Sequence, residues 1–112
     1  MSKRDDRLLL QDMAEAVDKI LRYTEGRSFD QWQGDEFLQD AVIRNFEVIG
    51  EACRHLSHAL TREHPDIDWG GIRDFRNLLV HEYFGVDATI VWEILSTDLP
   101  KLRTRLHELV GR

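Results

Sequence analysis

Cysteine is nearly absent from the sequence, and the single thiol, Cys53, has no partner for a disulfide within the chain. Disulfide frameworks are typical of small secreted domains, so the cysteine usage gives no sign of secretion. The first residues, MSKRDDR, lack the apolar run of a signal peptide, and no apolar stretch reaches the roughly 18 residues of a membrane span. We therefore expect a cytoplasmic protein that has no membrane partner.

Positive charge is also in short supply, with 15 Lys and Arg residues against 21 Asp and Glu residues and a formal net charge of -6. A protein that binds nucleic acid through its whole surface is usually basic. Any contact of this chain with nucleic acid must therefore be local. Basic residues gather near the two ends of the chain, where the simplest interpretation is a set of solvated helix faces: Lys3, Arg4, Arg7, Lys101, Arg103, Arg105 and Arg112.

Several common signatures are missing as well. The sequence has no P-loop, no dinucleotide-binding fingerprint and no serine-nucleophile motif. It shows no strand pattern, repeat, low-complexity tract or linker, so we expect residues 1–112 to form a single domain. Apolar residues make up 42% of the chain, which is normal for a globular protein large enough to bury a core.

Helical periodicity dominates the chain. The first apolar stripe recurs at steps of three and four residues before Gly26, and its members are Leu10, Met13, Val17, Ile20 and Thr24. Ser28 and Gln31 form a candidate capping box. The box would begin a short helical turn in which Phe29 and Trp32 pack against a larger element.

A long helix is predicted from about Asp35, because one face carries the apolar stripe Leu38, Ala41, Val42, Phe46, Ile49, Cys53 and Leu56. Gly50 inside this helix should cost about 1 kcal/mol relative to Ala. Gly50 and Ala52 are small enough to let another backbone come close, which would compensate for that cost. Cys53 lies on the stripe and is expected to be a buried small hydrophobe.

The segment HPDIDWGG, residues 64–71, is predicted to be a turn with Asp68 as the N-cap of the next helix. That helix should run from about residue 69 to residue 84 and end at Gly85. Asp87 can cap a last helix, which Pro100 should kink or restart, with Asp98 as a cap for the restarted part. The expected architecture is an all-α, antiparallel bundle of four or five helices.

The stretch RNLLVHEYF, residues 76–84, places four polar groups in an otherwise apolar helical segment. At about 100° per residue, Asn77 and His81 share one face, with Arg73 one turn earlier. Arg76 and Tyr83 share a neighbouring stripe, whereas Arg76 and His81 point about 140° apart. A second copy of the helix across a two-fold axis would bring them together better than one helix can. The spacing thus permits a dimer site without requiring one.

These residue types can cleave RNA without a metal. His81 can transfer protons near neutral pH, Arg76 can stabilise the charge on a phosphoryl group, and Asn77 can orient the histidine or the substrate. The 2′-hydroxyl would then attack the adjacent phosphate. Spacing alone favours a plainer interpretation, in which His81 pairs with Glu82 or Asp74 and Arg76 forms a surface ion pair.

The pattern Arg-polar-x-x-x-His-x-Tyr resembles the signature of HEPN-domain proteins, and most of all their HepT branch, the toxin half of HepT–MntA toxin–antitoxin pairs. The likeness extends beyond the motif to three segments in the same order. They are DAVIRNFEVIGEA (residues 40–52), DWGGIRDFRNLLVHEYFGVD (residues 68–87) and DLPKL (residues 98–102). The resemblance therefore covers most of the chain.

The resemblance implies a helical bundle that forms a homodimer or higher oligomer, with the motifs of two subunits lining a cleft. It implies metal-independent cleavage of RNA by Arg76, Asn77 and His81, with Arg73 as a candidate substrate contact and no cofactor. The resemblance reaches Arg73 and Glu51 more weakly than the residues of the motif. It also implies that a partner MntA-like nucleotidyltransferase neutralises the toxin by transferring AMP from ATP to Tyr83. An added AMP would bring bulk and a negative phosphate into the cleft.

Two other functions remain open at this stage. In the first, the chain is a non-catalytic companion that binds a nucleotide or substrate for a minimal nucleotidyltransferase. The acidic net charge is compatible with that alternative. In the other it is a structural dimerisation domain with a vestigial motif, against which the intact Arg76, His81 and Tyr83 argue. Tyr83 beside Phe84 would then be only the edge of the core.

His55 and His58 are three residues apart and could begin a metal site. The sequence shows no third ligand for them. We therefore expect capping or solvent-exposed roles for both.

Overall fold

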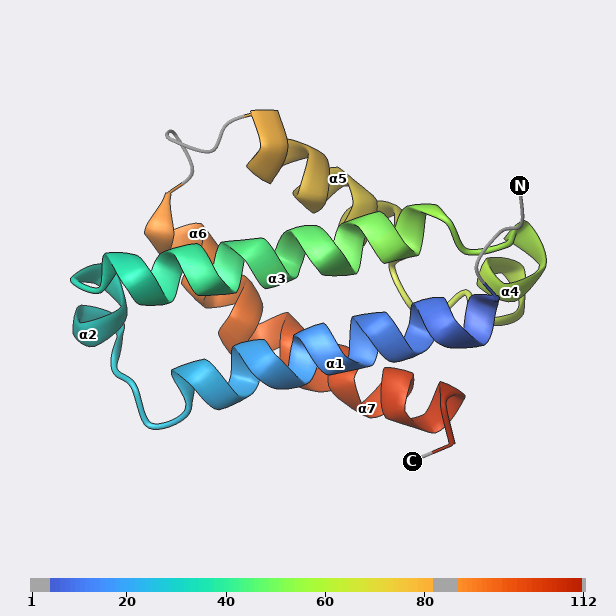
Figure 1. Ribbon diagram of the computed structural model, residues 1–112, viewed down its shortest axis with the longest axis horizontal. Coiled ribbons are helices and arrows are strands. Elements are labelled where there is room, and N and C mark those ends of the chain that lie inside the picture. The colour runs from blue at the N-terminus through green and yellow to red at the C-terminus, as the bar shows by residue number, and fades with distance from the viewer. Residues whose placement is uncertain (1–4, 82–86, 112) are drawn as a thin grey trace.

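The computed structural model describes residues 5–81 and 87–111, and of His81 it describes the backbone only. Within these ranges the chain is helical and contains no strand, which confirms the predicted all-α class. The elements are α1 (Asp6–Thr24), α2 (Phe29–Gln33), α3 (Glu36–Arg54), α4 (His58–Glu63), α5 (Trp69–His81), α6 (Ala88–Glu93), the π-helical turn η2 (Ile94–Asp98) and α7 (Leu99–Leu109). Figure 1 shows their arrangement.

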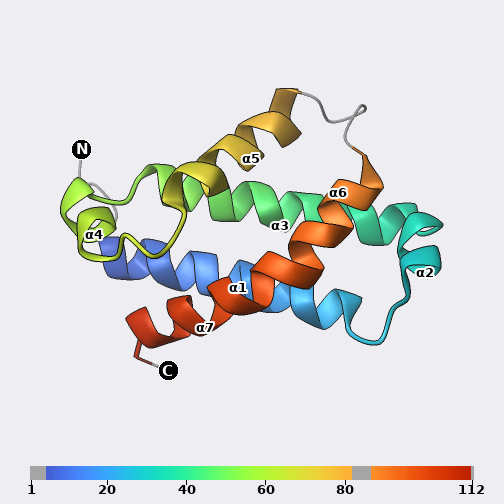
Figure 2. The same cartoon turned by 180° about the vertical axis from the view of Figure 1, so that it is seen from behind.

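The two long helices, α1 and α3, lie side by side and run in opposite directions (Figures 1 and 2). α7 packs on α1, and α5 packs on α3. The predicted stripes point into the core between these helices, where Met13, Val17, Ile20 and Val42 have no exposed surface. Cys53 is 1% exposed, as expected from its place on the stripe. No helix within the described ranges is long and apolar enough to cross a membrane.

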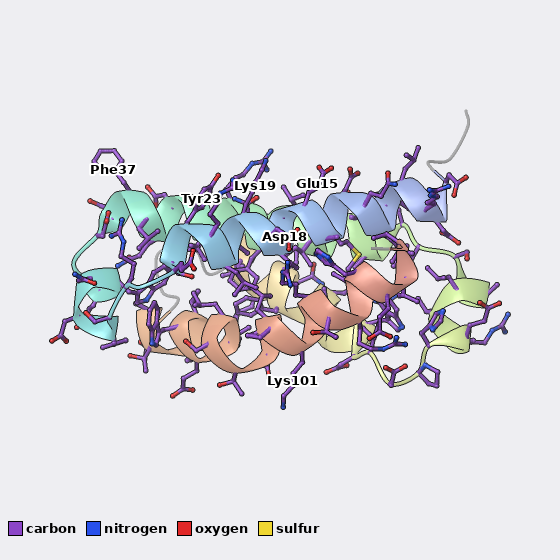
Figure 3. All side chains as sticks on the ribbon, turned by 90° about the horizontal axis from the view of Figure 1, so that it is seen from below. Glu15, Asp18, Lys19, Tyr23, Phe37 and Lys101 are labelled. Atoms are coloured by element: carbon purple, nitrogen blue, oxygen red, sulfur yellow. The ribbon has the colours of Figure 1, made fainter. Side chains whose placement is uncertain are left out.

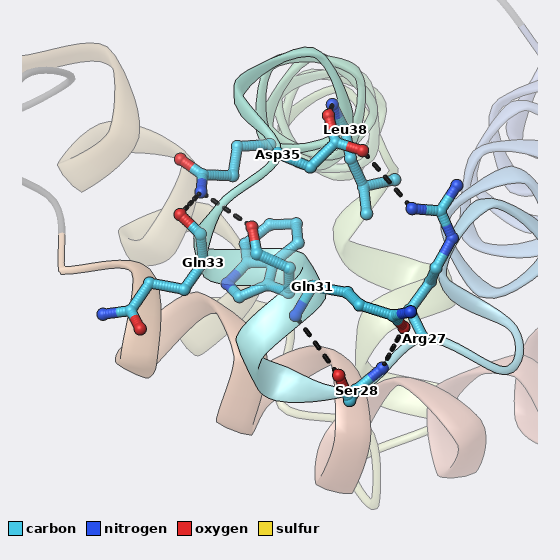
Figure 4. Close-up of polar contacts among 8 residues, drawn as sticks. Arg27, Ser28, Gln31, Gln33, Asp35 and Leu38 are labelled. Atoms are coloured by element: carbon cyan, nitrogen blue, oxygen red, sulfur yellow. Dashed lines mark hydrogen bonds and ion pairs between the residues drawn. The ribbon is translucent and has the colours of Figure 1, made fainter.

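Side-chain caps fix where the elements begin. Ser28 and Gln31 form the predicted capping box of α2, with the Gln31 backbone N–H donating to Ser28 Oγ and the Ser28 N–H donating to Gln31 Oε1 (Figure 4). Asp35 caps α3 through the N–H of Leu38 and also pairs with Arg27 (Figure 4). These bonds set the sharp reversal that places α3 antiparallel to α1.

The short α2 helix packs as predicted, because Trp32 is fully buried in the core. Its indole N–H donates to the carbonyl of Ala88 at 2.9 Å, and its ring lies 5.7 Å from that of Trp92. Phe29 meets the same Trp92 ring edge-on at 6.2 Å. This aromatic group fixes the beginning of α6 against the end of the α1–α3 pair.

The last helical stretch restarts near Pro100, but Asp98 does not cap it. Asp98 keeps helical dihedrals, φ −89° and ψ −37°, and makes no capping hydrogen bond with its side chain. A cap residue needs an extended backbone to turn its oxygen toward the next N–H groups. The wider π-helical turn at Ile94–Asp98 precedes the proline instead, with the Leu99 N–H donating to the Ile94 carbonyl. The expectation for Asp98 was therefore wrong.

The basic residues near the C-terminus do more than face solvent. Arg103 donates to Asp18 of α1 at 2.9 Å, and His107 approaches the same carboxylate at 2.9 Å. Arg105 pairs with Asp66, in the segment before α5, at 2.6 Å. α7 is thus tied by ion pairs to α1 and to the beginning of α5.

Candidate functional site

The helix that carries the polar motif, α5, is held firmly at its beginning. Asp68 accepts a hydrogen bond from the N–H of Gly71 at 2.9 Å, as the predicted cap should. The indole N–H of Trp69 donates to the His64 carbonyl at 3.0 Å. Leu79 is fully buried on the inner face. Towards its C-terminal end α5 diverges from α3 (Figures 1 and 2), whereas Arg76, in the middle of the helix, still lies against α3.

Gly50 determines how closely α5 approaches α3. A Cβ atom at Gly50 would overlap Cβ and Cγ of Arg76, and it would lie 3.4 Å from the Arg76 Cα. The helices can therefore cross here only because position 50 lacks a side chain. The predicted close approach of another backbone is confirmed at Gly50, and the residue that approaches is the arginine of the motif.

Arg76 extends across α3 and meets a carboxylate. Its Nη2 atom lies 3.1 Å from Oε2 of Glu51, and its Nη1 atom donates to Oδ1 of the neighbouring Asn77 at 3.3 Å. The side chain is 28% exposed, so its charge is neither buried in the core nor free in solvent. Spacing alone allowed a surface ion pair for Arg76, and the structure contains one, with Glu51 as the partner.

Two more side chains, both from α3, contact the carboxylate of Glu51. His55 Nε2 lies 3.1 Å from Oε1, and Arg54 Nη2 donates to the same oxygen at 3.2 Å. The hydrogen bond with His55 is the largest of the influences that hold the pKa of Glu51 below its ordinary value. Arg54 and Arg76 act in the same direction, and partial burial acts against them.

Glu51, His55 and Arg76 line a hollow of about 410 Å³ between α1, α3 and α5. Its wall contains three acids and two arginines besides His55, and the lining residues are Leu9, Asp12, Arg44, Glu47, Val48, Glu51, Ala52, His55 and Arg76. The charges of its formally ionised residues do not sum to a cationic pocket. A phosphate would therefore be attracted to the Arg76 guanidinium itself rather than to the hollow as a whole.

Of the remaining predicted site residues, the structure describes some and leaves others outside its described ranges. Asn77 and Arg73 are exposed on α5, one turn apart, as the spacing predicted. His81 is the last described residue of α5, and its side chain lies outside the described residues. Tyr83 lies outside them altogether, as do the predicted helix end at Gly85 and the neighbouring Glu82 and Phe84. The structure therefore brings Arg76 and Asn77 together.

No cluster of three or more His, Cys, Asp and Glu side chains suited to a metal is present in the described part of the chain. His55 is engaged with Glu51 and is 55% exposed. His58 is the first residue of α4. The exposed role predicted for His55 agrees with this geometry.

Glu51 and His55 are the site residues that spacing did not connect to Arg76, although the resemblance included Glu51 weakly. Two signals were present in the sequence. Glu51 and His55 are four residues apart, which puts them on one helix face, and Glu51 directly follows the glycine that predicted a close approach. Neither signal identified the approaching residue, because that depends on how α5 is placed against α3.

An all-α bundle whose motif helix exposes an arginine held between an acid and an amide is consistent with the HEPN-type resemblance. The family model for HepT-like ribonucleases matches residues 13–109, and the chain belongs to this family. It is therefore a member of a family of RNA-cleaving enzymes of the HEPN type, as the motif predicted.

Two relatives illustrate the match. "Putative RNase MJ1380" of Methanocaldococcus jannaschii is 33% identical over 107 residues, which cover 96% of this chain and 98% of that protein. "Probable ribonuclease HepT" of Thermococcus cleftensis is 36% identical over 107 residues, covering 96% of this chain and 97% of that protein. No solved structure matches the chain significantly.

Proposed function

We propose that the chain is a metal-independent endoribonuclease and the toxin of a toxin–antitoxin pair, with Arg76, Asn77 and His81 as its catalytic residues. Family membership and the ribonuclease names of its relatives support RNA as the substrate. The observation that carries the site is the guanidinium of Arg76, which is prepositioned between Glu51 and Asn77 and remains partly exposed. The match over residues 13–109 supports one HEPN-like domain across residues 1–112.

The proposed reaction uses the RNA's own nucleophile. His81 accepts the proton of a 2′-hydroxyl as its oxygen attacks the adjacent phosphorus, and the bond to the 5′-oxygen breaks. A proton then passes to that leaving oxygen, which yields a 2′,3′-cyclic phosphate and a free 5′-hydroxyl. Arg76 stabilises the charge that develops on the phosphoryl oxygens, and Asn77 holds Arg76 through its amide oxygen. Arg73, exposed one turn before Asn77, contacts a flanking phosphate.

The site is proposed to form between two subunits. Arg76 and His81 are five residues apart and leave a single helix in different directions. On the same end of α5, Leu78 and Val80 expose 43% and 45% of their surfaces. Two apolar side chains beside the motif support a second subunit as the cover of this face, because burying them there would remove apolar area from water.

We propose that a partner MntA-like nucleotidyltransferase regulates this site through Tyr83. The phenolic oxygen of Tyr83 attacks the α-phosphorus of ATP, pyrophosphate leaves, and the phenolic proton is lost to the solvent or to a base of the partner. The product carries a bulky nucleotide with a negative phosphate. Two residues beyond His81, such a group would occupy the cleft and repel the phosphates of RNA.

The first test is the loss of single side chains. His81→Ala and Arg76→Ala should each reduce RNA cleavage by at least about 10²-fold, as is typical for a positioned acid–base or charge-stabilising group. Growth inhibition on controlled expression should disappear in parallel, while the helical circular-dichroism signal remains. Wild-type cleavage should persist in excess EDTA. Loss of cleavage in EDTA, or a normal rate with His81→Ala, would contradict this mechanism.

A non-catalytic role is the second candidate, and the charge of the site favours it. Asp12, Glu47 and Glu51 line the hollow beside Arg76, and the chain as a whole carries a formal net charge of -6. In this alternative the protein binds a nucleotide for a partner nucleotidyltransferase. Binding of ATP by the wild type, together with no detectable cleavage of RNA and no growth inhibition without the partner, would support it over the ribonuclease.

A further inference from the structure

Three nitrogen-bearing side chains converge on the carboxylate of Glu51. Two of them contact one oxygen and the third contacts the other. His55 and Arg54, from the same helix, occupy Oε1 at 3.1 Å and 3.2 Å. Arg76, from α5, faces Oε2 at 3.1 Å. The contacts within α3 therefore fix the direction in which Glu51 presents its second oxygen, and that direction is toward α5.

The side of Glu51 that faces Arg76 is shielded from water even though the residue as a whole is not. The Glu51 side chain is 43% exposed, yet its Oε2 atom is buried and has no hydrogen-bond partner among the described residues. An ion pair at a shielded atom is screened less than one in open solvent. Arg76 is therefore held here more firmly than by an ordinary surface pair.

Arg76 is fixed at both ends of its side chain. Its Cβ and Cγ lie against Gly50 and leave no room for a side chain at position 50, and its guanidinium meets Glu51 and Asn77. A guanidinium has five N–H donors, four of them on Nη1 and Nη2; Nε is buried and has no hydrogen-bond partner within the described part of the chain. The contacts to Glu51 and Asn77 thus fix the group without exhausting its donors.

We propose that Glu51 is a positioning residue for Arg76, and that His55 and Arg54 keep its carboxylate aimed at that arginine. This inference rests on the proposed RNA cleavage at Arg76. Ordering an arginine side chain costs conformational entropy, and an unordered guanidinium would bear this cost when it binds the phosphoryl group. Glu51 imposes that order before the substrate arrives, so the charge is already in place in the transition state.

The test compares two glutamates that each pair with an arginine. Glu51→Gln keeps the shape of the side chain and removes its charge. We expect kcat for RNA cleavage to fall about tenfold to a hundredfold with KM within about twofold of the wild type, because a misaligned group mainly loses interactions of the transition state. Glu108→Gln is the matched control, since it removes the ion pair with Arg105 on α7 at 2.8 Å, and it should leave both constants unchanged.

A second readout does not need activity. In ¹⁵N relaxation measurements, the Nε–H group of Arg76 should be ordered in the wild type and mobile on the picosecond–nanosecond timescale in Glu51→Gln. The Nε–H group of Arg105, which donates to Asp66, serves as the internal reference and should be unchanged. His55→Ala, which leaves only Arg54 on Oε1 and keeps the charge of Glu51, should show a smaller loss of order and of kcat.

The outcomes separate the two proposals. Equal order of Arg76 in the wild type and Glu51→Gln overturns the positioning role, and so does wild-type cleavage by Glu51→Gln or an equal loss with Glu108→Gln. A wild type that cuts no RNA contradicts the proposed ribonuclease, while the relaxation measurement still decides whether Glu51 holds Arg76. If Glu51→Gln lowers the helical circular-dichroism signal, His55→Ala is used instead. The order of Arg76 and kcat are then compared with the wild type while Glu51 is intact.

Discussion

At the scale of single residues, the Arg76–Glu51 pair has a defined response to pH. The pKa of Glu51 is lowered by His55, Arg54 and Arg76. A carboxyl group whose pKa is lower in the folded chain than in the unfolded chain stabilises the fold above the unfolded value, and this contribution is lost as the pH falls through the folded pKa. The hold on Arg76 is therefore complete at neutral pH and weakens only in acid.

Tyr83 is the residue whose role depends most on a partner. Tyr83→Phe keeps the ring and removes the oxygen that would accept AMP, so it should leave RNA cleavage intact and abolish neutralisation. Mass spectrometry after incubation with the partner nucleotidyltransferase and ATP should show added AMP on the wild type and none on Tyr83→Phe. Tyr23→Phe is the matched control, because it removes the other tyrosine hydroxyl of the chain. Modification mapped to Tyr23 or to a serine would contradict the assignment.

The sequence predicted which residues belong to the site better than it predicted the contacts that their side chains make. Arg76, Asn77 and Arg73 were singled out from spacing and resemblance. The structure exposes Arg73 and Asn77 on α5 and places the partly buried Arg76 against α3. The contact of Arg76 with Glu51 was not predictable in the same way. It depends on a crossing between two helices, and helix periodicity gives the buried face of each helix without the register between them.

At the scale of elements, the same distinction holds. Apolar stripes and caps predicted α1, α2, α3 and α5, and the predicted beginnings of α2, α3 and α5 at Ser28, Asp35 and Asp68 are confirmed. The cap of α1, Asp5, was not predicted. α4 was missed because none of its residues is fully buried and it has no stripe to reveal it. The π-helical turn before Pro100 was also not predicted, because Pro100 indicated a kink or restart without indicating the type of turn that precedes it.

The α3–α5 crossing is the contact that can be tested most directly. Gly50→Ala adds a methyl group that overlaps Arg76, and overpacking of this kind typically costs about 1–3 kcal/mol, partly offset by the roughly 1 kcal/mol that Ala gains over Gly in a helix. We expect lower stability in chemical denaturation and lower RNA cleavage, since Arg76 moves with α5.

Gly70→Ala is the control for this change. Gly70 also lies in a helix, at the beginning of α5, and its nearest neighbour to an added Cβ is an Asp68 oxygen at 4.0 Å. Here the gain in helix propensity is not opposed, so the free energy of unfolding should rise by up to about 1 kcal/mol. Equal effects of the two substitutions would show that α5 does not depend on the space at Gly50.

At the scale of the whole molecule, exposed apolar side chains lie on more than one face. Leu78 and Val80 accompany the motif on α5, whereas Phe37, which is 91% exposed, projects from α3 on the same side as Tyr23 and Lys19 (Figure 3). Exposed apolar residues are common singly, so exposure alone does not identify an interface. The proposed dimer distinguishes the faces, because it requires the one that carries Arg76 and Asn77.

The last prediction compares a charge placed on the α5 face with the same charge placed on the face that carries Phe37. Val80→Asp places a charge in the proposed interface, where burying it without a partner is costly, so the dimer should dissociate and RNA cleavage should fall together with it. Phe37→Asp places the same charge on the more exposed residue of the other face and should leave both the dimer and the activity unchanged. Light scattering at micromolar concentrations measures the first quantity and an RNA cleavage assay the second. A wild type that is monomeric yet active would contradict the proposal that two subunits share the cleft. Loss of the dimer through Phe37→Asp with retention through Val80→Asp would move the interface to the α1–α3 face, away from Arg76.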